Sequence, residues 1–176
     1  MAFEIVHPAV VHFPVALLMT AAPVAILGAI TRKPTWQRVA TVCLVLGAAG
    51  SFMAVETGED MDEEESPAGK RLIEEHEEMA EKTMYSAIAL ALLSIGVEVA
   101  TARSMGPKAL GTAGRWTVAA GSVAVAGMVG YTGHLGAQSV WPELVGPNAT
   151  GTTPEGGAVK GEGGAAKGEG GEKDND

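Results

Sequence analysis

Cysteine is almost absent from this chain of 176 residues, which contains only Cys43. No disulfide can form within the chain, and the paired-cysteine motifs that bind metals cannot occur. The sequence also contains no P-loop, no dinucleotide-binding glycine motif, no nucleophile elbow and no basic nucleic-acid surface. We therefore expect neither nucleic-acid binding nor an enzyme that acts on its own.

Charged residues are rare in four long stretches, although 19% of the whole chain is charged. These apolar blocks cover residues 9–30, 36–56, 84–102 and 116–137. Each is close to the ~20 residues that cross a ~30 Å hydrocarbon layer. The helices of a soluble bundle would carry polar stripes facing water, which these blocks almost entirely lack. The sequence therefore predicts an all-α integral membrane four-helix bundle with up-down-up-down order.

A removable signal peptide is not expected at the N-terminus. No basic stretch precedes the first apolar block, and the block is too long for a signal core. No small-residue cleavage pattern follows it before "TRKPTWQR". The first helix is therefore expected to stay in the membrane.

Lysine and arginine are concentrated in two short connections, and this distribution indicates the orientation of the chain. The connections "TRKPTWQR" and "RSMGPKALGTAGR" hold six basic residues: Arg32, Lys33, Arg38, Arg103, Lys108 and Arg115. In a four-span protein both connections lie on one face, which we expect to be cytoplasmic. Both termini would then lie on the outer, periplasmic side of a bacterial inner membrane.

The connection between the second and third blocks, residues 57–82, is strongly acidic. From Glu56 to Lys82 the sequence holds twelve Asp or Glu against three basic residues, an excess equal to the net charge of −9 of the whole chain. Leu72 and His76 recur at helical spacing on one face, with glutamates around them. This pattern predicts an acidic helix outside the membrane that extends the third span.

The last part of the chain, residues 143–176, is rich in glycine, small residues and acidic residues. It repeats "KGEGG" at a seven-residue step and contains very little that a folded core would bury. Such a composition is typical of disorder. We therefore expect a four-span domain over residues 1–142, followed by a disordered acidic tail.

All four histidines of the sequence are expected at the outer face of the membrane. In a bundle that begins outside, the first span starts, the second ends, the third starts and the fourth ends at that face. These places hold all four histidines, His7, His12, His76 and His134, together with Glu56 and Asp60. His12 lies one turn inside the first span, where ionisable residues are costly and usually functional.

Small residues line parts of the second and fourth blocks. Gly127 and Gly130 share one helical stripe with His134, and "GAAGS" covers residues 47–51. Such stripes let another helix or a flat ligand approach closely, and close helix packing is the default interpretation.

Several of these motifs together resemble a known bacterial membrane family. They are "HPAVVHFPVALL", a small-residue-rich second span with an acidic end, a histidine ahead of the third span, and "GYTGHLGAQSVW". Over about residues 5–142 the chain is similar to domain of unknown function 2231. Members generally end the fourth span with a Gly-Gly-Glu-Leu-Val-Tyr pattern, which "GAQSVW" replaces here, so the glutamate and tyrosine are missing. The resemblance implies a four-span protein that accompanies cytochrome-type electron carriers.

The first functional hypothesis is a heme-binding or metal-binding subunit associated with electron transfer. Heme b needs two axial imidazoles on opposing helices and an apolar slot for the ring. The preferred axial pair is His12 with His76 or His134, and Gly127 and Gly130 would make room for the ring. Non-heme iron, copper or zinc is equally reasonable because imidazole suits all three. The candidate metal ligands are the outer-face set: His7, His12, His76, His134 and Glu56.

A heme at this face would relay single electrons between a quinol or another redox membrane subunit and a periplasmic carrier. The acidic helix would then attract a basic partner such as a c-type cytochrome, because a surface of one sign steers encounter. The bland interpretation is that the acidic residues only keep the connection solvated.

The second hypothesis is a non-catalytic structural subunit or assembly factor without a cofactor. Its histidines would form an interfacial hydrogen-bond network, and its small-residue faces would pack against partner helices. A transporter has less support, because only His12 and Glu98 are ionisable residues deep inside an apolar block. Glu98 also lies close enough to the cytoplasmic end to reach the interface.

Overall fold

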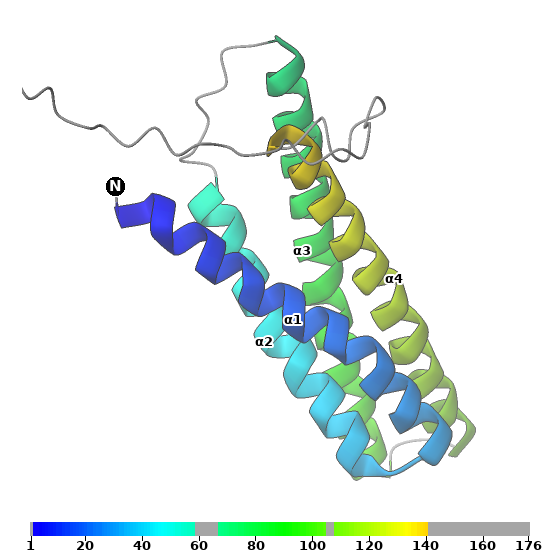
Figure 1. The fold of residues 1–176 in the computed structure, drawn as a ribbon. Coiled ribbons are helices and arrows are strands. Elements are labelled where there is room, and N and C mark those ends of the chain that lie inside the picture. The colour runs from blue at the N-terminus through cyan, green and yellow to red at the C-terminus, as the bar shows by residue number, and fades with distance from the viewer. Residues whose placement is uncertain (1, 59–66, 105–107, 141–176) are drawn as a thin grey trace, which may run out of the picture.

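Four helices make up the described part of the chain (Figure 1). In this computed structural model the backbone is described for residues 2–58, 67–104 and 108–140, and the side chains for 11–57, 71–104 and 111–138. The helices are α1 (Ala2–Thr31), α2 (Pro34–Gly58), α3 (Pro67–Ala102) and α4 (Lys108–Val140). Within these ranges there is no strand, so the predicted all-α fold is confirmed.

Each helix contains a segment long and apolar enough to cross a membrane. These segments are Val11–Thr31, Pro34–Thr57, Arg71–Ala102 and Gly111–Gln138. Large apolar side chains also point away from the bundle, for instance Ile30 and Leu92, which are more than three-fifths exposed. Lipid tails are a favourable surrounding for such an apolar exterior, whereas water is not. The prediction of a four-span membrane protein is therefore confirmed.

The acidic helix is continuous with the third span, as predicted. α3 has 36 residues, which corresponds to about 54 Å, whereas the hydrocarbon layer is only ~30 Å thick. Two exposed ion pairs lie along its first half, Arg71–Glu75 at 2.9 Å and Lys82–Glu78 at 2.7 Å, and each joins residues one helical turn apart. Residues 59–66 of the acidic connection and the predicted tail at 143–176 lie outside the described residues.

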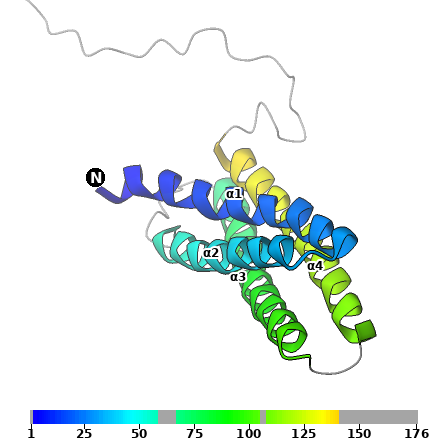
Figure 2. The ribbon, with the colours of Figure 1, turned by 90° about the horizontal axis from the view of Figure 1, so that it is seen from below.

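The helices form two hairpins, α1–α2 and α3–α4, that pack side by side. α1 also contacts α4 and α2 also contacts α3, which closes a four-helix bundle. In Figure 1 the ends of α1 and α3 lie at the same end of the bundle as the starts of α2 and α4, and in Figures 1 and 2 α1 runs away from α4 toward its N-terminus. The buried core is built from a few larger side chains, Leu18, Leu44 and Val118, among many alanines.

Glycines bring the two helices of each hairpin close together. A Cβ built on Gly47 of α2 would lie 2.7 Å from Leu18 Cδ2, and one on Gly121 of α4 would lie 2.6 Å from Leu90 Cδ1. Both distances are shorter than real carbon contacts. The close packing expected of "GAAGS" is therefore present between α1 and α2.

The α1–α2 connection is a tight turn that brings Gln37 against the end of α1. Arg32 adopts a left-handed conformation (φ 57°), and its N–H donates to the carbonyl of Gly28 at 3.0 Å. This geometry ends a helix by satisfying one of its last carbonyls. Pro34 then begins α2, where a missing N–H costs nothing. A Cβ on Gly28 would lie 3.2 Å from Gln37 N, so the bare glycine backbone allows this approach.

Candidate functional site

The outer-face histidines were predicted at one end of the bundle, and the helix ends that carry them do lie at the same end. The start of α1, the end of α2, the start of α3 and the end of α4 share one end in Figure 1. At this end the N-terminal part of α1 diverges from α4 in both views. The position of each side chain therefore decides which residues are neighbours.

His76 is held between α3 and α4. Its Nδ1 lies 2.9 Å from the carbonyl oxygen of Thr132, and its ring is half-buried. A carbonyl can only accept, so Nδ1 carries the hydrogen and donates it. One turn further along α4, a Cβ on Gly136 would lie 3.0 Å from His76 Cε1. The imidazole of His76 thus packs on the backbone of Gly136, and its hydrogen bond to Thr132 fixes the orientation of the ring.

His134 lies on the other side of α4. It is two residues after Thr132 and two before Gly136, and two residues turn an α-helix by about 200°. The His134 side chain is exposed, and its Nε2 accepts a hydrogen bond from Gln138 Nε2 at 2.9 Å. Within one chain, His76 and His134 therefore do not face each other across a shared space.

The remaining candidate ligands of the outer face are distributed over α1 and α2. His12 lies on α1 with an exposed side chain, and Glu56 is exposed near the end of α2. His7 belongs to α1, but its side chain lies outside the described residues. Among the described side chains, no three or more His, Cys, Asp or Glu gather as a metal site would require. The metal-ligand set therefore stays a prediction.

Gly127 and Gly130 face away from the other described helices. Both are exposed, and a Cβ added to either would meet no atom within 4 Å. Among the described residues, the close packing expected of this stripe is therefore not present. On the opposite side of α4, Gly114, Gly121 and Gly136 make the close contacts with α3 instead, against Val97, Leu90 and His76. The stripe presents a smooth outer surface to lipid, to a flat ligand or to another protein.

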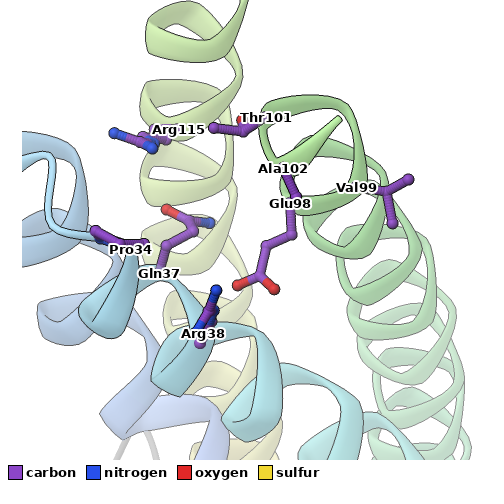
Figure 3. A pocket seen from close by; sticks show the side chains of 8 residues that line it. All are labelled: Pro34, Gln37, Arg38, Glu98, Val99, Thr101, Ala102 and Arg115. Atoms are coloured by element: carbon purple, nitrogen blue, oxygen red, sulfur yellow. The ribbon is translucent and has the colours of Figure 1, made fainter. Parts of the chain in front are cut away.

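A cavity of about 380 Å³, lined by both charged and apolar side chains, lies at the opposite end of the bundle. It opens between the start of α2, the end of α3 and the first turns of α4 (Figure 3). In the figure Gln37 reaches toward the space between Arg115 and Glu98, and Arg38 approaches from the α2 side. The lining also includes apolar and small residues: Pro34, Val99, Thr101 and Ala102.

Gln37 and Arg115 bring buried polar atoms without partners to this cavity. Gln37 is only 3% exposed, and neither its Oε1 nor its Nε2 has a hydrogen-bond partner among the described residues. The same holds for Nε of Arg115, whose Nη1 donates to the carbonyl of Arg32 at 3.1 Å. A buried polar group without a hydrogen bond costs ~1–3 kcal/mol, so such groups call for an explanation.

Glu98 is tied to the interior by a short chain of hydroxyl groups. Thr41 Oγ1 lies 3.1 Å from Glu98 Oε1 and 2.6 Å from Ser94 Oγ, and both hydroxyl residues are buried. Thr41 also lies 3.0 Å from the carbonyl of Gln37. These contacts join α2 to α3 next to the cavity and hold the Glu98 carboxylate in its lining.

Sequence reasoning passed over this inner site. It treated Glu98 as an interfacial residue and Gln37 as part of an apolar block, because their proximity depends on contacts between residues about sixty positions apart. One signal was available: Gln37 is a long polar side chain one residue from Arg38, at the start of a block with no further charge before Glu56.

Comparison with known proteins gives a single family. Residues 4–149 match the family described as "Predicted membrane protein (DUF2231)". No curated protein and no solved structure matches the chain. The match covers most of the 176 residues and agrees with the four apolar helices, so the chain belongs to the DUF2231 family of predicted membrane proteins.

Proposed function

We propose that this membrane protein is a subunit associated with electron transfer that binds heme b or a transition-metal ion at its outer face. The observation that supports this most directly is the hydrogen bond from His76 Nδ1 to the Thr132 carbonyl at 2.9 Å. Metal-ligating histidines almost always donate their second ring N–H in this way, which fixes the tautomer and ring orientation. In the neutral ring, Nε2 then carries the lone pair that a metal needs.

The partner ligand in this proposal is His12. It lies on α1, in the hairpin that does not contain His76, so the two imidazoles come from opposing helices as heme b requires. His134 lies on the far side of α4 and, with Gly127 and Gly130, would offer a separate surface for a flat ring. For iron, copper or zinc, the ligands would be drawn from His7, His12, His76, His134 and Glu56.

The acidic surface of α3 supports a basic partner at the same face. Glu74, Glu78 and Glu81 are exposed on the helix that extends beyond the third span. A surface with a net negative charge raises the rate of encounter with a basic protein and loses this effect in salt. A periplasmic c-type cytochrome or another redox subunit is the partner class that we propose.

The proposal includes an orientation in the bacterial inner membrane. The two short connections with Arg32, Lys33, Arg103 and their neighbours would lie in the cytoplasm, because basic residues in short loops are retained there. The histidines, the acidic half of α3 and both termini would lie on the periplasmic side.

The experiment is an absorption spectrum of the detergent-purified protein, oxidised and then reduced, with metal analysis of the same sample. A sharp reduced band that disappears in His76→Ala and in His12→Ala supports a heme bound by this pair. His134→Ala is the matched control, because this imidazole lies on the other side of α4. No colour and no stoichiometric metal, from a host that supplies both, would contradict the proposal.

A second candidate is a structural subunit without cofactor. The stripe of Gly127 and Gly130 and the neighbouring Gly133 favour it, since a Cβ added to any of the three would meet no described atom within 4 Å. Small-residue stripes of this kind let transmembrane helices of two proteins pack closely. This candidate predicts a colourless protein in which Gly130→Leu breaks co-purification with its partner and His76→Ala does not.

A further inference from the structure

We propose a second binding site, at the membrane face opposite the histidines: the cavity between α2, α3 and α4 binds the phosphate headgroup of an anionic glycerophospholipid. Its volume of about 380 Å³ lies within the ~300–1,000 Å³ range of small-molecule sites. The proposal does not depend on a heme or metal at the outer face.

The depth of the cavity matches that of lipid phosphates. It is lined by Pro34, the first residue of α2, and by Ala102, the last residue of α3. Residues at the ends of membrane-spanning helices lie near the headgroup layer. A lipid lying against the bundle can therefore place its phosphate in the cavity while its acyl chains stay beside the apolar exterior.

The hydrogen-bond donors of the cavity fit an oxyanion. Gln37 Nε2 and Arg115 Nε are buried donors without a partner among the described residues. Arg38 adds a guanidinium group from the next position on α2. Arginine and amide N–H groups in this arrangement bind the oxygens of phosphates with charge-assisted hydrogen bonds.

The charges of the lining match a phosphodiester. Arg38 and Arg115 carry two positive charges and Glu98 carries one negative charge, which leaves one positive charge for the single negative charge of the headgroup. Basic pockets between transmembrane helices are known to bind anionic lipid headgroups. A headgroup with its own positive charge would leave the lining charge uncompensated.

The remaining buried acceptor favours a headgroup that also carries a hydroxyl group. Gln37 Oε1 has no donor among the described residues and is 97% shielded with the rest of the side chain. This oxygen lies near Gly28 of α1, where an added Cβ would be 3.4 Å from it. A glycerol hydroxyl beside the phosphate would donate to it, whereas a choline group has no N–H or O–H.

The test uses the full chain in lipid nanodiscs of phosphatidylcholine, with or without phosphatidylglycerol. Native mass spectrometry measures the lipid retained, and thermal unfolding measures stabilisation. We expect selective retention of phosphatidylglycerol and a higher melting temperature with it. Gln37→Met keeps the volume but removes both hydrogen-bonding atoms, and we expect it to weaken this affinity about tenfold. Arg115→Lys keeps the charge but removes Nε–H, and we expect a weaker affinity there too.

Lys33→Gln is the matched control, because it removes one exposed positive charge from the same face outside the cavity. A loss of lipid retention in Lys33→Gln without a loss in Gln37→Met would mean that general surface charge attracts the lipid, which overturns the proposal. Equal retention of phosphatidylcholine would overturn it as well. Inorganic phosphate is titrated separately, and if it stabilises the protein and displaces the lipid completely, the site takes free phosphate rather than a headgroup.

A second measurement guards against misfolding. In lipid-free detergent, Gln37→Met is expected to melt at the same or a higher temperature than the unchanged protein, because a buried polar group without a partner is destabilising. A clearly lower melting temperature there would show that the carboxamide has a partner within the protein, which also overturns the proposal.

Discussion

His76 on α3 lies against the backbone of Gly136 on α4, with its Cε1 3.0 Å from the position that a Cβ would occupy there. One turn earlier, the Thr132 carbonyl accepts the hydrogen of His76 Nδ1 at 2.9 Å. Beside this contact, Thr83 Oγ1 lies 3.1 Å from Thr132 Oγ1. The outer end of the α3–α4 hairpin is thus joined by polar contacts that depend on a small residue at position 136.

Gly136→Ala is expected to destabilise the protein by displacing the His76 ring and lengthening its hydrogen bond. Overpacking and the loss of one hydrogen bond together predict about 1–3 kcal/mol. Denaturant unfolding in detergent measures the change in free energy. Gly133→Ala is the control, because an added Cβ there meets no atom within 4 Å, and alanine should stabilise that helix by up to ~1 kcal/mol. The same loss in both variants would contradict the contact.

The glycine contacts within each hairpin give a second prediction. Gly47→Val and Gly121→Val would force a side chain into Leu18 and Leu90. A Cβ added to Gly47 would lie 2.7 Å from Leu18 Cδ2, and one added to Gly121 would lie 2.6 Å from Leu90 Cδ1. We expect each variant to lose about 1–3 kcal/mol of stability. Gly130→Val, which faces open space, should change stability by less than about 1 kcal/mol. The melting temperatures of the three variants are compared in one detergent. A larger decrease for Gly130→Val than for the other two would contradict the assignment of inward and outward faces to these glycines.

The four helices and the continuation of α3 beyond the membrane could be predicted because both depend on local patterns. Apolar length sets the spans, and the helical spacing of Leu72 and His76 continues into the third block without a proline or glycine pair. The close packing predicted for the small-residue run of the second span is also confirmed, since Gly47 packs on Leu18.

The faces of α4 could not be predicted from its glycines, because glycine occurs on both sides of this helix. Gly127 and Gly130 share a stripe in the sequence and face outward, whereas Gly114 and Gly121 pack on α3. Which stripe faces inward depends on the rotation of the helix, which its neighbours determine. The inner cavity was missed for a related reason, since Gln37 and Glu98 meet only after two hairpins have packed.

Ser94→Ala is expected to destabilise the contact between α2 and α3. Ser94 is fully buried, and its hydroxyl lies 2.6 Å from Thr41 Oγ1. The Thr41 hydroxyl can donate only one hydrogen, but it lies within hydrogen-bond distance of two acceptors, the Glu98 carboxylate and the Gln37 carbonyl. The Ser94 hydroxyl supplies a second donor to this group of acceptors. Hydrogen bonds between membrane helices contribute about 0.6–1.7 kcal/mol, and we expect a loss of this size.

The matched control for this prediction is Ser51→Ala. Ser51 lies on α2 and its hydroxyl donates to the Gly47 carbonyl of its own helix at 2.9 Å, so this hydrogen bond does not join two helices. Its removal should change the free energy of unfolding by less than that of Ser94. An equal or greater effect at Ser51 would show that the link between α2 and α3 contributes little.

The orientation predicts which sites react with a membrane-impermeant thiol reagent in intact cells. Cys43 is the only cysteine and is buried, so Cys43→Ala provides a background without reactive thiols. In that background Glu74→Cys, exposed on the acidic half of α3, should react from outside, whereas Lys33→Cys, exposed between α1 and α2, should react only after the membrane is opened. The physical reason is the retention of basic short loops in the cytoplasm. The reverse pattern would show the opposite orientation, with the histidines and the acidic helix on the cytoplasmic side. A periplasmic partner would then be excluded from the proposed function.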